Sequence, residues 1–206
     1  LRNVILSPDE GQGTMGMTPF DVVLSPVKPA SGWADAPEDA LEFTLLMSKG
    51  LIRRVGLIVK NAQGIYDSVK LYKNKKSEEP IVILPKGEFV GGIFDEGIKN
   101  EIKYEVVRSM RILDLAEDGS HLKLWVSSAM DIHDNTLWHP KSLQQLVLDN
   151  CGPALPGSML GGYDEQLLKA CMVPQWGAMG QWQANTLNYL LDNEGYQVVF
   201  SHYHNV

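Results

Sequence analysis

The chain has 206 residues, of which 44% are hydrophobic and 21% are charged, as in an ordinary globular protein long enough to bury a core. Its formal net charge of −7 at pH 7 disfavours non-specific binding to nucleic acid or to an anionic membrane surface. The longest hydrophobic runs, such as residues 81–84 and 198–200, are far too short to span a bilayer. We therefore expect neither nucleic acid nor a membrane among its partners.

The first distinctive stretch is the hydrophobic run 4–6 followed by Gly11, Gly13 and Gly16, which spell G-x-G-x-x-G. Such a loop binds a dinucleotide when a strand leads into it and a helix begins inside it. Here a turn and a β-branched run, residues 18–24, follow the glycines. The acidic residue expected about twenty residues later, at the end of a second strand, is missing as well. We therefore expect a β-connection and not a dinucleotide-binding loop.

Residues 1–130 are predicted to form mainly strands and turns. Turn sequences at 61–64 and 117–120 separate neighbouring runs of strand type, and residues 25–37, with three prolines, are loop-like. The predicted strands are 3–6, 21–24, 41–47, 54–60, 65–71, 80–84, 101–115 and 121–126. Most connections are too short for helical crossovers, so the sheet should be largely antiparallel.

After Pro140 the hydrophobic spacing changes from every second residue to every third or fourth, which is typical of helices. Helices are predicted over 141–149, 163–172 and 174–193, and a strand over 197–201. The last helix carries one stripe, which should pack against the sheet or against helix 141–149: Trp182, Thr186, Tyr189 and Leu190. The expected fold class is therefore α+β.

Two groups of polar residues are candidate sites. His202 and His204 lie on the same face of an extended chain, so they either share a metal ion or are polar residues at the end of a strand. The second group is either a site or a set of loop hydrogen bonds and helix caps: Asp131, His133, Asp134 and His139. Sequences of the G-x-S-x-G, P-loop and H-E-x-x-H types are absent, so no complete active site is predicted.

The remaining features favour structural interpretations. Four lysines, residues 70, 73, 75 and 76, precede Glu78 and Glu79, which indicates a solvated hairpin tip. The five tryptophans are expected to anchor the core and interfaces. Cys151 and Cys171 have neither metal nor C-x-x-C spacing, so we expect reduced, buried thiols and a cytoplasmic location. A charged-then-apolar leader is missing, so no signal peptide is expected.

Residues 182–191, WQANTLNYLL, and residues 195–206, GYQVVFSHYHNV, resemble the alkaline phosphatase superfamily, in particular its type I phosphodiesterase and nucleotide pyrophosphatase branch. Residues 111–115 and 123–130 also look like the stretch that precedes this region in some bacterial members. The resemblance covers residues 105–206 and is weaker over 1–104.

The resemblance implies a phosphate-ester substrate, two divalent metal ions, typically zinc, and a Thr or Ser nucleophile. The nucleophile and metal ligands of that family match no position in this sequence, so no catalytic or metal-binding residue is assigned. His202, His204 and Asn205 lie beside the expected place of a metal-ligand motif and are candidates for substrate contact.

Two interpretations follow for the whole chain. In the first, residues 1–130 are a β-rich, cap-like region inserted into a hydrolase, and residues 131–206 are helices and a strand of its α/β catalytic core. The chain is then an internal fragment, inactive by itself, that covers the active site and shapes substrate choice. In the second, the chain is a self-contained small-molecule or protein-binding domain with no enzymatic role. The sequence leaves the oligomeric state open.

Overall fold

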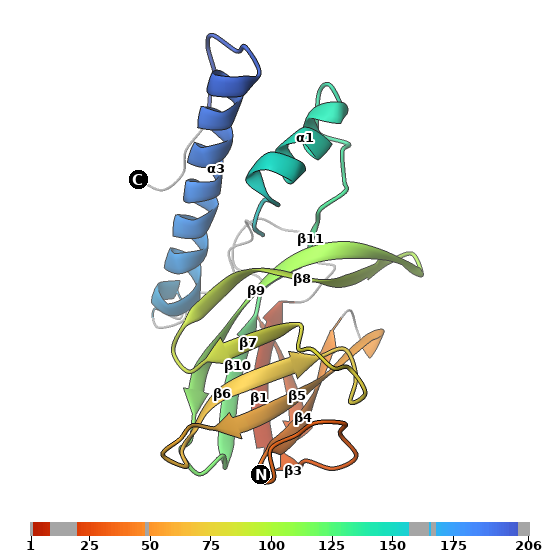
Figure 1. Ribbon diagram of the computed structural model, residues 1–206, viewed down its shortest axis with the longest axis vertical. Coiled ribbons are helices and arrows are strands. Elements are labelled where there is room, and N and C mark those ends of the chain that lie inside the picture. Colours follow the sequence, from red (N-terminus) through yellow and green to blue (C-terminus); the bar gives the residue numbers. More distant parts are fainter. Residues whose placement is uncertain (1, 9–19, 48–49, 157–164, 166–167, 202–206) are drawn as a thin grey trace.

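The computed structural model describes residues 2–8, 20–47, 50–156, 165 and 168–201. Within these residues the strands form two sheets, which make a β-rich body, and the helices α1 and α3 stand side by side at one end of it (Figure 1). Antiparallel sheets followed by helices confirm the predicted α+β class.

The larger sheet has the strand order β11-β9-β10-β1-β2, and β8 also pairs with β9. Its strands are β1 Arg2–Pro8, β2 Phe20–Pro26, β8 Phe89–Lys99, β9 Ile102–Leu115, β10 His121–Val126 and β11 Met130–Asp131. All of its pairs are antiparallel except β1 with β10, which is parallel. The glycines of the G-x-G-x-x-G stretch lie outside the described residues. The strands β1 and β2 lie on either side of this stretch and pair with each other, and the β-connection between them stays a prediction.

The smaller sheet is antiparallel throughout, in the order β3-β4-β5-β6-β7. Its strands are β3 Lys28–Pro29, β4 Leu41–Met47, β5 Ile52–Lys60, β6 Tyr66–Tyr72 and β7 Val82–Pro85. The predicted turn at 61–64 is present between β5 and β6, where the Asn61 side chain accepts hydrogen bonds from the backbone N–H groups of Gln63 and Ile65.

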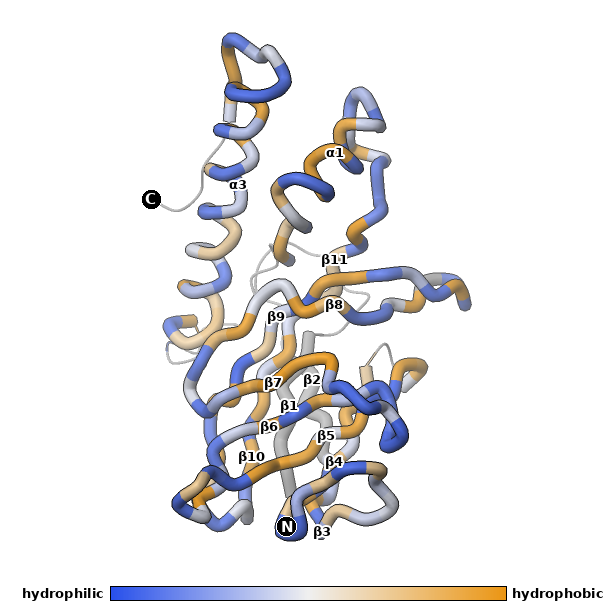
Figure 2. The backbone as a smooth tube through the Cα atoms, viewed as in Figure 1, coloured by the Kyte–Doolittle hydropathy of each residue, from blue (hydrophilic) through white to orange (hydrophobic). Residues whose placement is uncertain are grey.

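The main core lies between the two sheets. Alternate residues of β4 point into it, namely Phe43, Leu45 and Met47, and β10 contributes Leu122 and Leu124. Figure 2 shows hydrophobic stretches along β5 and β7 of the smaller sheet and mixed colouring along α3. A second cluster lies on the outer face of the smaller sheet. There the ring of Trp33, from the loop before β4, meets the ring of Tyr72 edge-on at a centroid distance of 5.3 Å.

The helical part consists of α1 Ser142–Cys151, the π-helix η2 Leu168–Met172 and α3 Val173–Asn193. The predictions of helices over 141–149 and 174–193 are confirmed, and Pro174 lies in the first turn of α3 as expected. Of the remaining predicted helix, 163–172, residues 168–172 form the π-helix η2 and residue 165 is helical, whereas residues 163–164 and 166–167 lie outside the described residues. None of the described helices is long and apolar enough to cross a membrane.

A joint between η2 and the larger sheet attaches the helices to the β-rich body. The Cys171 side chain is completely buried and packs in a cluster with Trp125 of β10 and Phe89 of β8. The Arg111 guanidinium of β9 also donates a hydrogen bond to the Ala170 carbonyl. Cys151 and Cys171 are both free thiols, as predicted, although Cys151 is only partly buried.

One predicted strand is not found, and one observed strand was not predicted. Residues 197–201 form no strand, because no described sheet edge lies beside them to pair with their backbone. The strand β8 was not predicted, because Gly91, Gly92 and Gly97 interrupt its pattern. Gly92 has φ +70°, and the pairing of β8 with β9 shifts between Val90 and Ile93, which is a β-bulge.

Candidate functional site

A cavity of about 310 Å³ lies where the chain leaves the larger sheet and enters the helices. Its walls come from three places: the segment that begins at β11, the helix α1 with the residues after it, and α3. The described residues that line it are Met130, Asp131, Ile132, Asp134, Leu137, Trp138, Gln144, Val147, Leu148, Gly152, Pro153, Ala154 and Trp182. This size is at the lower end of the range for small-molecule sites.

Two side-chain hydrogen bonds hold the walls together. Gln144 is 8% exposed, and its Nε2 donates to the Ile132 carbonyl, which ties α1 to the segment after β11. The Trp182 Nε1 donates to the Gly152 carbonyl at 2.9 Å, which ties α3 to the end of α1. Gly152 has φ +76°, a conformation that other residues seldom adopt, and this allows the chain to turn directly after α1.

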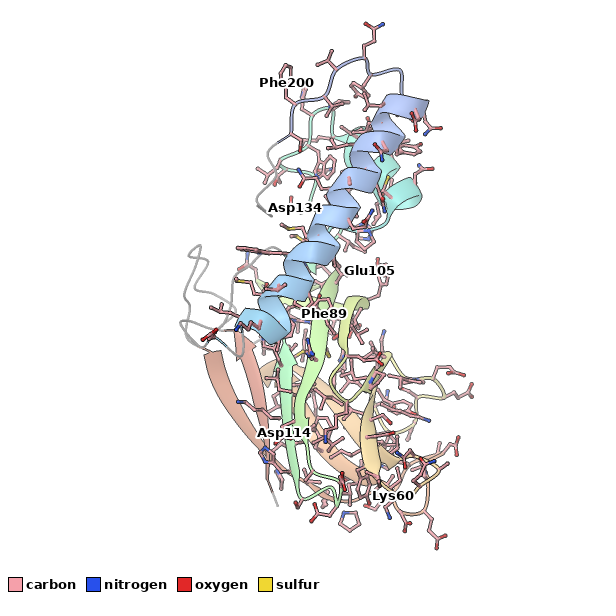
Figure 3. The ribbon with its side chains drawn as sticks, turned by 90° about the vertical axis from the view of Figure 1, so that its left-hand side faces the viewer. Lys60, Phe89, Glu105, Asp114, Asp134 and Phe200 are labelled. Atoms are coloured by element: carbon pink, nitrogen blue, oxygen red, sulfur yellow. The ribbon has the colours of Figure 1, made fainter. Side chains whose placement is uncertain are left out.

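The two carboxylates of the lining form local turns. Asp131 Oδ1 accepts a hydrogen bond from the His133 N–H, and Asp134 Oδ1 accepts one from the Thr136 N–H, each at 2.9 Å. These bonds fix the loop by the usual Asp side-chain turn. Figure 3 shows Asp134 at the level of the helical part.

The structure does not bring together the four polar residues that the sequence singled out. Asp131 and Asp134 line the cavity, whereas His133 and His139 are not among its described lining residues. The His133 Nε2 instead lies 2.8 Å from a carboxylate oxygen of Glu105 on β9, and both side chains are largely exposed. The second interpretation of this group consisted of loop hydrogen bonds and helix caps. The loop hydrogen bonds are present, at Asp131 and Asp134. The helix cap is not, because α1 has no side-chain cap.

The described lining of this cavity has features that suit the binding of a ligand. Its described lining holds two carboxylates and no serine, threonine, cysteine, histidine or lysine, so it offers no nucleophile paired with a base. Trp138 and Trp182 contribute aromatic surface, and Leu137, which is 96% exposed, stands at the rim. An aromatic lining with carboxylates favours a ligand that has an apolar body and a positive charge.

The other candidate residues, His202, His204 and Asn205, lie outside the described residues. Within the described parts of the chain, no group of three or more His, Cys, Asp or Glu side chains could hold a metal ion. We therefore derive no catalytic step from the described residues.

Sequence reasoning identified part of this site. The helical stripe was expected to pack against the sheet or against helix 141–149, and its Trp182 lines the cavity together with Val147 and Leu148 of α1. Gln144 was missed. Gln144 could have been identified from the helical spacing, because it lies three positions before Val147, on the buried side of α1, although its side chain is long and polar.

Comparison of the chain with family models, with curated proteins and with solved structures finds no significant match.

Proposed function

We propose that the chain is a non-catalytic part of a metal-dependent phosphodiesterase or nucleotide pyrophosphatase-like hydrolase, in which it covers the active site and shapes the choice of phosphate-ester substrate. The resemblance of residues 182–191 and 195–206 to the alkaline phosphatase superfamily supports this proposal. The free thiols of Cys151 and Cys171 support a cytoplasmic location.

The observation that carries the proposal is an exposed hydrophobic segment after α3. Tyr196, Val198 and Phe200 are 42%, 67% and 95% exposed, and no described strand pairs with them. Figure 3 shows Phe200 at the end of the molecule far from Lys60 and Asp114 of the β-rich body. A continuous hydrophobic run such as residues 198–200 is typical of a strand that is covered on both faces in a parallel sheet. The α/β core of a hydrolase would supply that sheet.

In this proposal the two parts of the chain have different tasks. The helices α1 and α3 and the exposed segment belong to the catalytic core, and the β-rich body lies over the substrate. The metal ions, two divalent cations and typically zinc, belong to the whole enzyme, where they would activate the nucleophile and stabilise charge on the phosphoryl group. His202, His204 and Asn205 are the residues of this chain that we propose for substrate contact.

An activity assay tests the proposal. The chain by itself should hydrolyse no nitrophenyl phosphodiester with zinc or manganese, whereas a longer polypeptide from the same gene should hydrolyse it. In that longer polypeptide, the double substitution V198D/F200D should abolish turnover, because two carboxylates cannot be buried in a sheet without partners. The variant K169Q changes an exposed residue of η2 and should retain turnover. Metal-dependent turnover by the chain alone would overturn the proposal.

The aromatic cavity favours a second candidate function, a self-contained domain that binds a small molecule or a protein. Under this alternative the chain alone should bind a small aromatic cation such as benzyltrimethylammonium, with a change in tryptophan fluorescence. The variant W182L, which removes one aromatic wall, should weaken that binding. Binding that W182L does not affect would count against the cavity as the site.

A further inference from the structure

A second cavity, also of about 310 Å³, lies in the β-rich body at the edge where β2 and β3 run beside β4. It is separate from the cavity beside the helices and shares no described lining residue with it. Polar and charged side chains supply much of its lining. The described lining residues are Ser25, Pro26, Lys28, Glu42, Phe43, Thr44, Leu46, Arg53, Val55 and Lys75.

The single carboxylate of this cleft is already neutralised. Glu42 has a side chain that is only 5% exposed, and Lys75 Nζ lies 2.6 Å and Lys28 Nζ 3.2 Å from its oxygens. The Trp33 Nε1 donates to the same carboxylate at 2.6 Å and the Ser31 N–H at 3.2 Å. With four donors directed at it, Glu42 holds the two lysines in place and has little capacity left to attract another cation.

Arg53 adds a positive charge that the cleft does not balance. Among the described residues, the Arg53 side chain donates one long hydrogen bond, 3.4 Å from Nη2 to the Thr44 Oγ1, and forms no ion pair with a carboxylate. A guanidinium presents a planar fork of N–H donors that matches two oxygens of a carboxylate or phosphate. Three cations therefore face one carboxylate in the cleft, which leaves an excess positive charge of two.

We propose that this cleft binds a small dianionic oxyanion, with Arg53 as the principal contact and Lys28 and Lys75 as supporting charges. The excess charge matches a dianion, and Phe43, Leu46 and Val55 offer a hydrophobic wall for a short carbon chain attached to it. The whole chain carries a net charge of −7, which repels anions in general. Binding of an anion therefore requires a local arrangement of this kind. The proposal does not rest on the hydrolase function, since it concerns the chain alone and needs no metal.

Calorimetric titration of the full chain at low ionic strength, without divalent metals, tests the site. The probes are inorganic phosphate and succinate, which carry the same chemistry as a phosphate ester and as a dicarboxylate. At least one should bind with one molecule per chain and at least tenfold more tightly than acetate, which has a single charge. Binding should weaken as salt is added. Binding by phosphate alone identifies a phosphate ligand, and binding by succinate alone identifies a dicarboxylate.

Two variants with equal loss of charge locate the site. R53Q should weaken binding about tenfold or more, because it removes the charge-assisted hydrogen bonds. K169Q removes a positive charge from η2, which lies outside this cleft, and should leave binding within twofold of the unmodified chain. Arg53 is exposed, so R53Q should fold normally, which circular dichroism verifies. The proposal is overturned if neither probe binds, or if R53Q binds as tightly as the unmodified chain.

Discussion

At the scale of single residues, Glu42 illustrates a balance between burial and hydrogen bonding. Burial by itself raises the pKa of its carboxyl group, but the hydrogen bonds from Lys75, Trp33, Ser31 and Lys28 outweigh burial. Together they lower the pKa from 4.5 to about 2. The folded state therefore binds this proton less readily than the unfolded state, so Glu42 stabilises the fold above pH 4.5 and this contribution is lost as the pH falls toward 2.

We predict that E42Q lowers the free energy of unfolding at pH 7 by up to about 3.5 kcal/mol, because the pKa falls from 4.5 to about 2 and one pKa unit corresponds to about 1.4 kcal/mol. The difference between E42Q and the unmodified chain should shrink as the pH falls from about 4.5 toward 2. Urea unfolding at a series of pH values measures it. E88Q, which changes an exposed glutamate, is the matched control and should show no such trend. A constant difference across this pH range would contradict the assignment.

Gly56 shows how the absence of a side chain permits a close contact. It lies directly opposite Phe43 in the pairing of β4 with β5, and a Cβ atom added to it would lie 2.2 Å from Cε1 of that ring. Phe43 is 3% exposed and packed in the main core, so moving its ring would disturb its contacts there. The glycine is therefore required by this ring and not by a turn.

We predict that G56A destabilises the fold by about 1–3 kcal/mol, the usual cost of overpacking a core. In the F43L background the same substitution should cost less, because the smaller side chain makes room for the new methyl group. A double-mutant cycle measured by urea unfolding gives this coupling. Equal costs in the two backgrounds would show that the ring is not the obstacle.

At the scale of elements, a buried ion pair joins the two sheets. Arg54 of β5 donates from Nε at 2.9 Å and from Nη2 at 2.5 Å to the Asp95 Oδ1 of β8, and both side chains are almost fully buried. Arg108 of β9 lies nearby, with its Nε 3.9 Å from the Asp95 Oδ2. Glu96 accepts a further hydrogen bond from Arg54 at 2.8 Å but is 31% exposed. Asp95 is therefore the principal buried counter-charge of Arg54.

We predict that D95N destabilises the fold by about 3–5 kcal/mol, because it removes the buried counter-charge of Arg54. E96Q removes the partly exposed partner of the same Arg54 and should cost about 1 kcal/mol or less, because water screens it. Urea unfolding of both variants compares the two positions directly. A cost for E96Q equal to that for D95N would mean that burial does not decide the contribution.

The extent to which the sequence predicted these elements has physical causes. Strands 41–47 and 121–126 were predicted with their observed bounds, because short turns and regular alternation mark them. The strand β8 was missed, because its glycines serve a bulge and a close packing contact that become visible only beside β9. The ion pair of Arg54 with Asp95 and the cleft around Glu42 were also missed. Arg54 and Asp95 are separated by 41 positions in the sequence, and Glu42 and Lys75 by 33 positions. No local sequence pattern connects positions so far apart.

At the scale of the whole molecule, the helices and the β-rich body meet at a joint around Cys171. This thiol is fully buried between η2 and the larger sheet, in one cluster with Trp125. Burial raises its pKa to about 12 and outweighs the opposing effect of the positive charges of Arg111 and Lys123. The thiolate, which is the reactive form, is therefore almost absent at neutral pH. Cys171 should react only when the joint opens.

We predict that a maleimide at pH 7 labels Cys151, which is partly buried, and leaves Cys171 unmodified in the folded chain. C151S should then show almost no labelling in native buffer and one label per chain in denaturant. With increasing urea, labelling of Cys171 in C151S should rise at the same midpoint as the loss of β-sheet circular dichroism, because Trp125 belongs both to the joint and to β10. That result would show that the helices and the β-rich body unfold as one cooperative unit. Labelling of Cys171 at a clearly lower urea concentration would show instead that η2 and α3 detach before the sheets unfold.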